Sequence, residues 1–174
     1  MLGTGRIHLY YGDGKGKTTA AMGQVIRAAG SGLQVLVFQF LKNNESIERK
    51  ILEQIPNITC LHGREPVKFV SRMNGDEKAD IRHYNNKALD EIVKFCTPFD
   101  VLLLDEALCA VQLNVLSEEK LISFLKHKPR GLEIILTGHV VTDNILELAD
   151  YVTQMNKIKH PYDQGIMARE GIEF

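Results

Sequence analysis

The residues with the clearest potential for chemistry lie in segment 6–19, RIHLYYGDGKGKTT, where an apolar stretch runs into a turn rich in glycine and lysine. Three glycines let the backbone curl so that successive N–H groups point into one concavity, and a lysine and a threonine follow them. A helix starting near Lys17 would also direct the positive end of its dipole toward bound phosphates. The segment therefore predicts a site for a nucleotide polyphosphate. Its candidate binding residues are Gly12, Asp13, Gly14, Lys15, Gly16, Lys17, Thr18 and Thr19.

The spacing of this loop differs from the usual phosphate-loop signature, which has four residues between its first glycine and the Gly-Lys-Thr triplet. Here Gly12 and Gly16 enclose only three residues, and Tyr11 stands where the first glycine would be. A glycine turn without a ligand is the alternative. The order of strand, glycines, Gly-Lys-Thr and helix favours polyphosphate binding.

An acidic pair, Asp105 and Glu106, follows directly after the apolar stretch Val101–Leu104. A carboxylate at the carboxyl end of a parallel strand can bind the metal ion that bridges the phosphates. Thr18 is the matching ligand from the loop, and Mg²⁺ is the expected ion because it prefers oxygen ligands and substrate phosphates. The alternative is that one of the two acids caps a following helix.

Two further positions have open interpretations. Thr137, with Gly138 and His139 after it, ends another apolar stretch and would lie near the phosphates in a doubly wound fold. Its hydroxyl can bond a phosphate or a metal-bound water, or the three residues can simply turn the chain at the surface. Arg27 lies ten residues into the predicted first helix, where an exposed arginine without a ligand is the alternative.

The elements that would position these residues alternate between strands and helices. Several apolar runs are continuous, which is typical of strands buried on both faces. After a first strand before the loop, the predicted strands are Leu33–Phe40, Ile58–Leu61, Val101–Leu104, Leu132–Leu136 and Tyr151–Met155. Helices are predicted at Thr18–Ala29, around Leu89 to Cys96, and after Ser117, which can cap a helix. The polar stretch from Gly63 to Asp80, interrupted by Gly75, is either a binding loop or an exposed connector.

This alternation predicts parallel strands joined by right-handed crossovers. The expected fold class is α/β, a single domain over residues 1–174 with a doubly wound, mainly parallel sheet and helices on both faces. This is the RecA-like architecture of the P-loop nucleotide-binding fold.

Composition narrows the class of partner. The chain has 174 residues, 44% of them hydrophobic, and a formal net charge of −1, so no basic field is expected to hold nucleic acid. No apolar run reaches the length of a membrane span or a signal segment, so no membrane partner is expected. Three cysteines without a Cys-x-x-Cys spacing predict reduced, packing residues. The expected location is the cytoplasm.

Three separated segments together resemble one family. They are GDGKGKTTAAMGQVIRAAGSGLQVLVFQFLK, LLLDEA, and the carboxyl-terminal ILTGHVVTDNILELADYVTQMNKIKHPYDQGIMAREGIEF. Over nearly the whole chain the sequence is similar to the ATP:corrinoid adenosyltransferases of cobalamin biosynthesis and salvage. The resemblance implies a reaction in which the Co(I) form of a corrinoid attacks the 5′ carbon of ATP and inorganic triphosphate leaves. It also implies that ATP binds with its phosphates reversed relative to ordinary phosphate-loop enzymes.

The resemblance implies roles for particular residues. Gly12 to Thr18 would bind the triphosphate, with Arg27 reaching a phosphate or the ribose. Lys17, Thr18 and Glu106 would be the catalytic residues, and Thr18 with Asp105 or Glu106 would bind the metal. The family places aromatic residues against the corrin, but this chain has no tryptophan and offers Phe69 in the corresponding segment. An electron-donating reductase and a homodimer are also implied.

Two other functions share part of this pattern. A phosphoryl-transferring kinase or ATPase would use the same loop and acidic strand end, and it would yield ADP instead of triphosphate. A regulator that binds nucleotide or corrinoid without catalysis would need the same ligands for binding alone.

Overall fold

The computed structural model describes residues 3–65 and 68–173. Within this part of the chain the strands form one sheet, in the order β3-β2-β4-β5-β1-β6, and every pairing is parallel. The predicted α/β fold with a parallel sheet is confirmed. The strands are β1 Ile7–Tyr11, β2 Val35–Gln39, β3 Ile58–Cys60, β4 Val101–Asp105, β5 Glu133–Gly138 and β6 Tyr151–Gln154.

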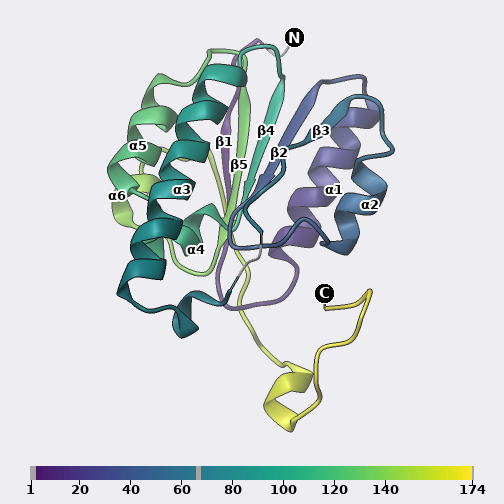
Figure 1. The fold of residues 1–174 in the computed structure, drawn as a ribbon. Helices are drawn as coiled ribbons and strands as arrows, with labels where there is room; N and C mark the ends of the chain where they lie inside the picture. Colours follow the sequence, from purple (N-terminus) through teal and green to yellow (C-terminus); the bar gives the residue numbers. More distant parts are fainter. Residues whose placement is uncertain (1–2, 66–67, 174) are drawn as a thin grey trace.

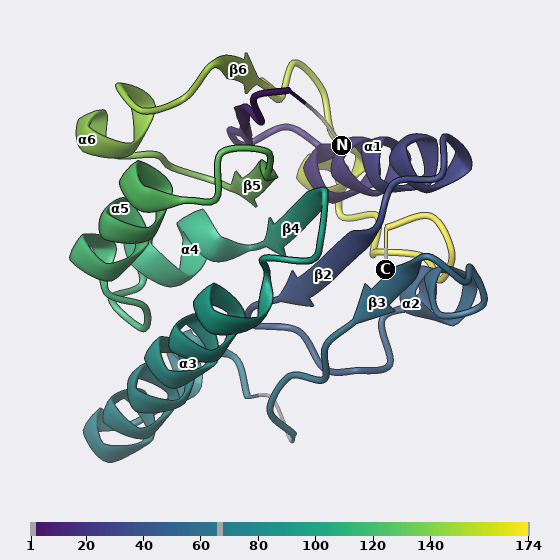
Figure 2. The same ribbon diagram turned by 90° about the horizontal axis from the view of Figure 1, so that it is seen from above.

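Helices cover both faces of the sheet, with α1 and α2 on one face and α3, α4 and α5 on the other (Figure 1). The view from above shows the same two layers on either side of the strands (Figure 2). The helices are α1 Lys17–Gly30, α2 Ile47–Leu52, α3 Gly75–Phe95, α4 Ala107–Gln112, α5 Glu118–His127 and α6 Asp143–Leu146, with 3-10 turns at Val70–Arg72 and Pro161–Gln164.

Two apolar cores hold these layers together. Alternate residues of the central strands face opposite sides, so Leu103 packs in the core under α1 while Leu104 packs in the core under α3 and α5. All five residues of β2 and of β4 are buried, as the continuous apolar runs predict. Full burial of one such leucine contributes about 1.5–3 kcal/mol.

Strand β6 departs from this pattern. It lies at the edge of the sheet beside β1, and all four of its residues are exposed. The prediction of a strand is confirmed, but burial on both faces is wrong for it, because side chains pointing to either face of this edge strand are exposed. Beyond β6, residues 156–173 extend away from the sheet (Figure 1).

The segment Gly63 to Asp80, predicted to be a binding loop or an exposed connector, contains the start of a long helix. Gly75 does not interrupt the chain there but is the first residue of α3. The helix begins at a capping box in which Asn74 accepts the Glu77 N–H at 2.9 Å and Glu77 accepts the Asn74 N–H at 2.8 Å.

The parallel register brings four strand ends to the same edge of the sheet. Gln39 of β2 lies opposite Asp105 of β4, and Tyr11 of β1 lies opposite Gly138 of β5. Because β4 and β5 are also paired in register, with Leu104 opposite Leu136, side chains that follow these strands converge.

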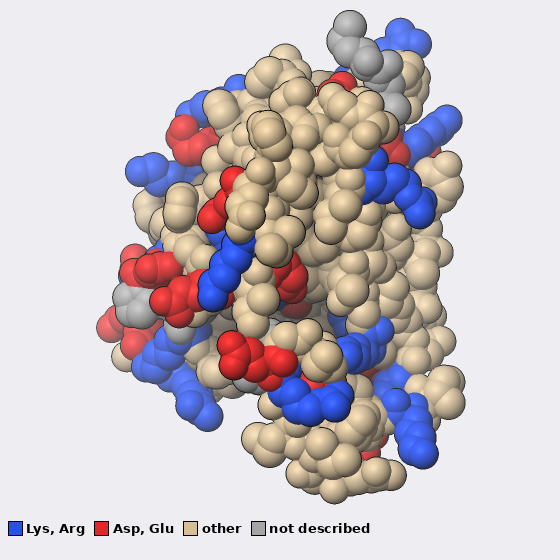
Figure 3. Space-filling model, turned by 90° about the vertical axis from the view of Figure 1, so that its right-hand side faces the viewer, with Lys and Arg blue, Asp and Glu red and all other residues tan. Residues whose placement is uncertain are grey.

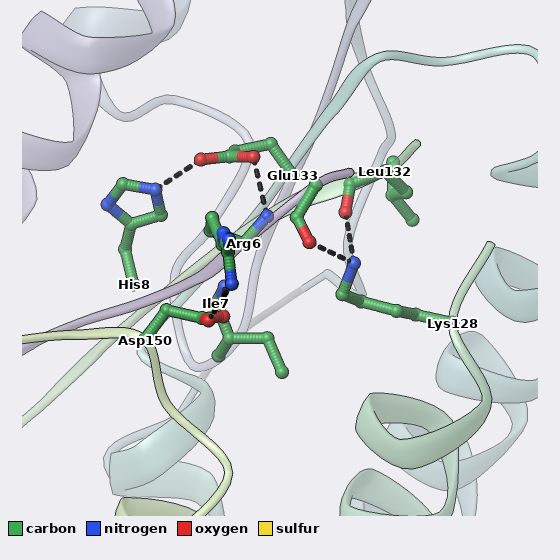
Figure 4. A network of polar contacts seen from close by, with 8 residues as sticks. Arg6, Ile7, His8, Lys128, Leu132, Glu133 and Asp150 are labelled. Atoms are coloured by element: carbon green, nitrogen blue, oxygen red, sulfur yellow. Dashed lines mark hydrogen bonds and ion pairs between the residues drawn. The ribbon is translucent and has the colours of Figure 1, made fainter. Parts of the chain in front are cut away.

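A polar network holds together the amino ends of β1, β5 and β6, at the end of the sheet away from the glycine loop (Figure 4). The Asp150 carboxylate accepts a hydrogen bond of 2.7 Å from the Arg6 guanidinium and one of 2.9 Å from the Ile7 N–H. Glu133 accepts the Arg6 N–H at 2.6 Å and contacts the His8 ring. These contacts fix the start of β1, and so the position of the loop at its other end.

Charges of both signs are interspersed on the face that carries α1 and α2 (Figure 3). Neither sign of charge dominates on the side shown, in line with a net charge of −1 for the chain.

Candidate functional site

The glycine loop between β1 and α1 has a backbone that only glycine adopts without strain. Gly12 and Gly16 have φ angles of 117° and 108°. The chain after β6 also approaches the loop closely, since a Cβ on Gly12 would lie 2.3 Å from the carbonyl oxygen of Met155. The Gly14 N–H donates to that same oxygen at 2.8 Å. The glycines therefore serve the loop shape and its contact with residue 155.

Polar side chains of the loop are held by the loop itself and by the carboxyl-terminal segment. The buried Lys17 ammonium donates to the Gly14 carbonyl at 2.7 Å, so it folds back over the loop. The Asp13 carboxylate accepts the Lys157 N–H at 2.9 Å, and this hydrogen bond holds the pKa of Asp13 below its usual value. The carboxyl-terminal segment therefore braces the outer side of the loop.

Asp105, the last residue of β4, is the centre of the site. It is fully buried, and its two oxygens accept four hydrogen bonds or ion pairs. Asp105 Oδ1 accepts hydrogen bonds from the hydroxyls of Thr18, at 3.0 Å, and Thr137, at 2.7 Å. Oδ2 accepts Gln39 Nε2 at 3.1 Å and Lys42 Nζ at 2.9 Å. The structure thus joins the glycine loop, β2, β4 and β5 at one carboxylate.

The electrostatics of this cluster keep both Asp105 and Lys42 charged. Burial by itself would raise the pKa of Asp105, but the charge of Lys42 and the hydrogen bonds from Thr137 and Gln39 lower it below the usual value. Burial by itself would lower the pKa of Lys42, but the attraction of Asp105 raises it above the usual value. Near neutral pH the centre is therefore an ion pair.

Glu106 does not cap a helix with its side chain, although it stands at the N-cap position of α4. Its backbone is in the left-handed region, with φ 60°, and its N–H donates to Thr137 Oγ1 at 2.8 Å. The side chain of Asp105 is likewise engaged with the site and not with α4. The alternative interpretation, in which one of the two acids caps the following helix with its side chain, is therefore wrong.

The structure resolves part of the open interpretation of Thr137. Thr137 is fully buried and positions both acids, since it donates to Asp105 and accepts the N–H of Glu106. Gly138 ends β5 and allows α4 to pack closely, because a Cβ there would lie 2.5 Å from Leu108 Cβ. His139 is exposed, and its carbonyl accepts the Gly12 N–H at 3.0 Å.

Sequence reasoning missed Gln39 and Lys42. Gln39 is the last residue of β2 and lies within the predicted buried strand Leu33–Phe40, but no role in the site was predicted for it. Lys42 follows three residues later. The available signal was their position, since both come at the carboxyl end of a strand where the phosphate site is expected. The direction of Lys42 also depends on the turn after β2, where Leu41 has φ 59°.

Oxygen donors at this edge fit a magnesium ion. The Thr18 hydroxyl and the carboxylates of Asp105 and Glu106 are the ligand types that Mg²⁺ takes together with waters and substrate phosphates. Gln39 Oε1 is buried and has no hydrogen-bond partner, so one more acceptor is present. No group of three His, Cys, Asp or Glu forms a metal cluster among the residues described. The donor set suits a metal that arrives with phosphates.

Two of the predicted ligand-binding residues lie apart from this cluster. Arg27 is exposed in the last turn of α1, ten residues and so about 15 Å along the helix from Lys17, and within this chain the structure does not bring it to the loop. Phe69 is 74% exposed, and the Arg72 guanidinium lies 5.6 Å from its ring centroid. The neighbouring Lys68 lines a small pocket that also contains Gln39 and Lys42.

The three cysteines are free, as expected for packing residues. Burial, and secondly the charge of Glu106, raise the pKa of Cys109 to about 12. A thiol with such a pKa is protonated near neutral pH and is a poor nucleophile in that form.

Comparison with known families identifies the chain. Residues 3–174 match the family model for the "ATP:corrinoid adenosyltransferase BtuR/CobO/CobP". The chain belongs to this family. The chain is also similar to the corrinoid adenosyltransferases of Escherichia coli strain K12 and Salmonella typhimurium strain LT2, each 33% identical to it over 98% of its length and 86% of theirs. The resemblance inferred from the three motifs is confirmed, and with it the assignment as an adenosyltransferase enzyme.

Solved structures agree with the fold of this adenosyltransferase. The cytoplasmic domain of EssC has a TM-score of 0.55 and 17% identity, covering 97% of this chain and 34% of the EssC chain. EssC ATPases 2 and 3 from Geobacillus thermodenitrificans have a TM-score of 0.54 and 17% identity, covering 96% of this chain and 35% of that one. At this identity the likeness shows the fold alone. No helix in residues 3–65 and 68–173 is long and apolar enough to cross a membrane.

Proposed function

We propose that this adenosyltransferase transfers the 5′-deoxyadenosyl group of ATP to the Co(I) centre of a corrinoid in adenosylcobalamin biosynthesis or salvage. Cobalt supplies the electron pair of the new cobalt–carbon bond. The bond between C5′ and its oxygen breaks, and triphosphate leaves with that electron pair. Cobalt rises formally from Co(I) to Co(III). The observation that carries the proposal is the meeting of the glycine loop, through Thr18, with Asp105 in a chain of this family.

The loop and Lys17 would stabilise the leaving triphosphate. Negative charge grows on the phosphate oxygens as the bond breaks, and backbone N–H groups and an ammonium aimed at that charge lower the barrier. Mg²⁺, when bound at Thr18, Asp105 and Glu106, would neutralise part of the same charge. No side chain has to remove a proton, because Co(I) is itself the nucleophile. The protein's remaining tasks are alignment and exclusion of water.

The shape of the loop supports a nucleotide pose that differs from that of a kinase. The cradle is one residue shorter than the usual signature, and the Gly14 N–H is already bonded to the Met155 carbonyl. A cradle with fewer free N–H groups suits a pose that exposes C5′ instead of the γ-phosphorus. We therefore expect the reversed phosphate direction that the family resemblance implies.

Three further expectations belong to this proposal. An electron-donating reductase is expected from the family resemblance, because a donor has to supply the electron that forms Co(I). A homodimer is expected from the family resemblance. A cytoplasmic location is expected because the cysteines are free. Exposed Phe69 is the expected aromatic contact for the corrin.

One assay tests the reaction. The protein is mixed with ATP, Mg²⁺ and chemically reduced cobalamin without oxygen, the visible spectrum is followed, and the phosphate product is identified. A light-sensitive alkylcobalt species with an equal amount of triphosphate is the expected result. ADP without that species would favour the kinase, and bound ATP without any product would favour the regulator. Lys17→Ala should lose turnover, and full activity of this variant would remove the role given to the loop.

A further inference from the structure

A lysine ammonium lies between the two residues that are expected to hold the metal ion. Lys42 Nζ is 2.9 Å from Asp105 Oδ2 and 3.4 Å from Thr18 Oγ1. No other cation contacts Asp105 among the side chains described. The position that Mg²⁺ would take between Thr18 and Asp105 thus has a positive charge supplied by the chain.

The burial of Asp105 explains why a charge is needed there. The carboxylate is fully buried, and an isolated buried carboxylate is strongly unfavourable. Hydrogen bonds from Thr18, Thr137 and Gln39 help, but only Lys42 brings a compensating charge. Without it, a nucleotide-free site would have an unpaired buried anion.

The ammonium and a divalent cation exclude each other at this position. Both would contact Asp105 Oδ2 or its neighbour at about 2–3 Å, and like charges at such separations repel strongly in a buried site. Lys42 can leave, because its side chain is 27% exposed and ends a flexible four-carbon stem.

An acceptor for the released ammonium is already in place. Gln39 Nε2 donates to the same oxygen of Asp105 that binds Lys42, while Gln39 Oε1 is buried without a partner. Gln39 and Lys42 line one small pocket beside the end of β2. A buried acceptor without a donor is rare and costs stability, so a group that can reach it is expected.

We propose that Lys42 is an internal countercation, which holds the metal position in the nucleotide-free enzyme and moves to the Gln39 pocket when Mg²⁺ binds with the polyphosphate. This inference rests on the proposed function for the identity of the metal site. It makes Lys42 a positioning residue that couples metal binding to nucleotide binding. A metal ion alone has to displace Lys42 from Asp105, whereas a metal ion that arrives with a polyphosphate has the phosphate oxygens as further ligands that offset this cost.

Binding of Mn²⁺ alone tests the exchange without any turnover. Free Mn²⁺ is measured by electron paramagnetic resonance in titrations of the nucleotide-free protein. Lys42→Gln removes the charge and keeps a hydrogen-bond donor, so it should bind Mn²⁺ on the order of tenfold or more tightly than wild type. Lys68→Gln is the matched control. Lys68 lines the same pocket, but its ammonium pairs with Glu77 at 2.8 Å and not with Asp105, so this variant removes a positive charge that does not contact the metal position. Its Mn²⁺ affinity should stay within about twofold of wild type.

A second variant keeps the test decisive if Lys42→Gln folds poorly. Lys42→Arg keeps the charge, and a guanidinium can form two parallel hydrogen bonds with a carboxylate. Because Mn²⁺ would have to displace this stronger pair, the variant should bind Mn²⁺ more weakly than wild type. The double variant K42Q/D105N removes both charges and should lose the gain in Mn²⁺ affinity.

Melting temperatures identify the folded variants and provide an independent readout. Mn²⁺ should restore a lowered melting temperature of Lys42→Gln, because a ligand that binds only the folded state stabilises it. A folded Lys42→Gln that binds Mn²⁺ no more tightly than wild type overturns the proposal, as does a Lys42→Arg protein that binds it as tightly. Such results leave the adenosyl transfer assay untouched, whereas a gain in Mn²⁺ affinity without any adenosylation would count against the proposed function alone.

Discussion

The Thr18 hydroxyl donates a hydrogen bond of 3.0 Å to Asp105 Oδ1, which joins the first turn of α1 to the end of β4 across 87 positions of sequence. This bond brings the hydroxyl and the carboxylate that are proposed as metal ligands into direct contact. It also means that the two residues cannot be separated in function, because a change at Thr18 alters the surroundings of Asp105.

Thr18→Val should reduce kcat/KM for adenosyl transfer on the order of 10–100-fold, because it removes an expected metal ligand and one donor to Asp105 while keeping the volume. Thr18→Ser retains the oxygen and should stay within a few-fold of wild type. Steady-state kinetics at varied Mg²⁺ would show the loss in the valine variant as a weaker response to the metal. Equal kinetics for the two variants would contradict the role of the hydroxyl.

Much of this site follows from local sequence. The order of strand, glycines and Gly-Lys-Thr predicts the loop, and acids after a continuous apolar run predict Asp105 and Glu106 at the sheet edge. These features are short-range, so one segment contains the whole signal. The predicted strand at Leu33–Phe40 agrees with β2 to within two residues at each end, and the one at Val101–Leu104 agrees with β4 to within one.

What the sequence did not reveal depends on packing between distant segments or on short elements. Helices α2, α4 and α6 have only four to six residues, which is too few for an apolar period to be recognised. The contact of Lys42 with Asp105 joins the segment after β2 to the end of β4, and no local pattern specifies it. Asn74 and Glu77 have the spacing of a capping box and so indicate the start of α3 in the sequence. Gly75, which lies between them, suggested a break instead.

Gly14→Ala should weaken ATP binding by at least about tenfold, because a Cβ there would lie 2.8 Å from the Met155 carbonyl oxygen and 2.9 Å from the Asn156 carbonyl carbon. Both neighbours are backbone atoms, so the loop has to shift. Isothermal titration with ATP measures the loss.

Gly23→Ala is the control for that substitution. A Cβ on Gly23 meets nothing within 4 Å, and the residue lies in the middle of α1. Alanine there should stabilise the protein by about 0.5–1 kcal/mol and leave ATP affinity unchanged. If Gly14→Ala binds ATP as well as Gly23→Ala does, the close contact with residue 155 has no part in shaping the cradle.

Acid should destabilise the wild type partly through Asp105. Burial would raise its pKa, but Lys42, Thr137 and Gln39 lower it below the unfolded value near 3.9, so the folded state resists protonation. This contribution is therefore complete well above pH 4 and is lost as the pH falls toward the folded pKa. Asp105→Asn should cost on the order of 1–3 kcal/mol at pH 7, and its deficit should shrink in acid.

Urea unfolding at several pH values between 7 and 3 would measure this deficit. Repeating the series at high salt separates Asp105 from the exposed ion pairs, because salt screens surface charges and affects a buried pair far less. A deficit that stays constant with pH, or that disappears in salt, would show that the buried ion pair is not its source.

Phe69→Ala should impair use of the corrinoid and leave ATP binding intact. The ring is 74% exposed and follows Lys68, which lines the pocket at the Asp105 edge, so a flat apolar ligand can cover it. Losing one aromatic contact of about 0.5–1.5 kcal/mol predicts a rise of roughly 2- to 12-fold in the KM for corrinoid, and Phe69→Trp should retain or improve it. Phe95→Ala is the matched control, since that ring is 49% exposed but lies at the last residue of α3, just before the opposite edge of the sheet. The assignment of Phe69 fails if both alanine variants leave the KM for corrinoid unchanged, or if both raise it equally, because only a local contact separates the two positions.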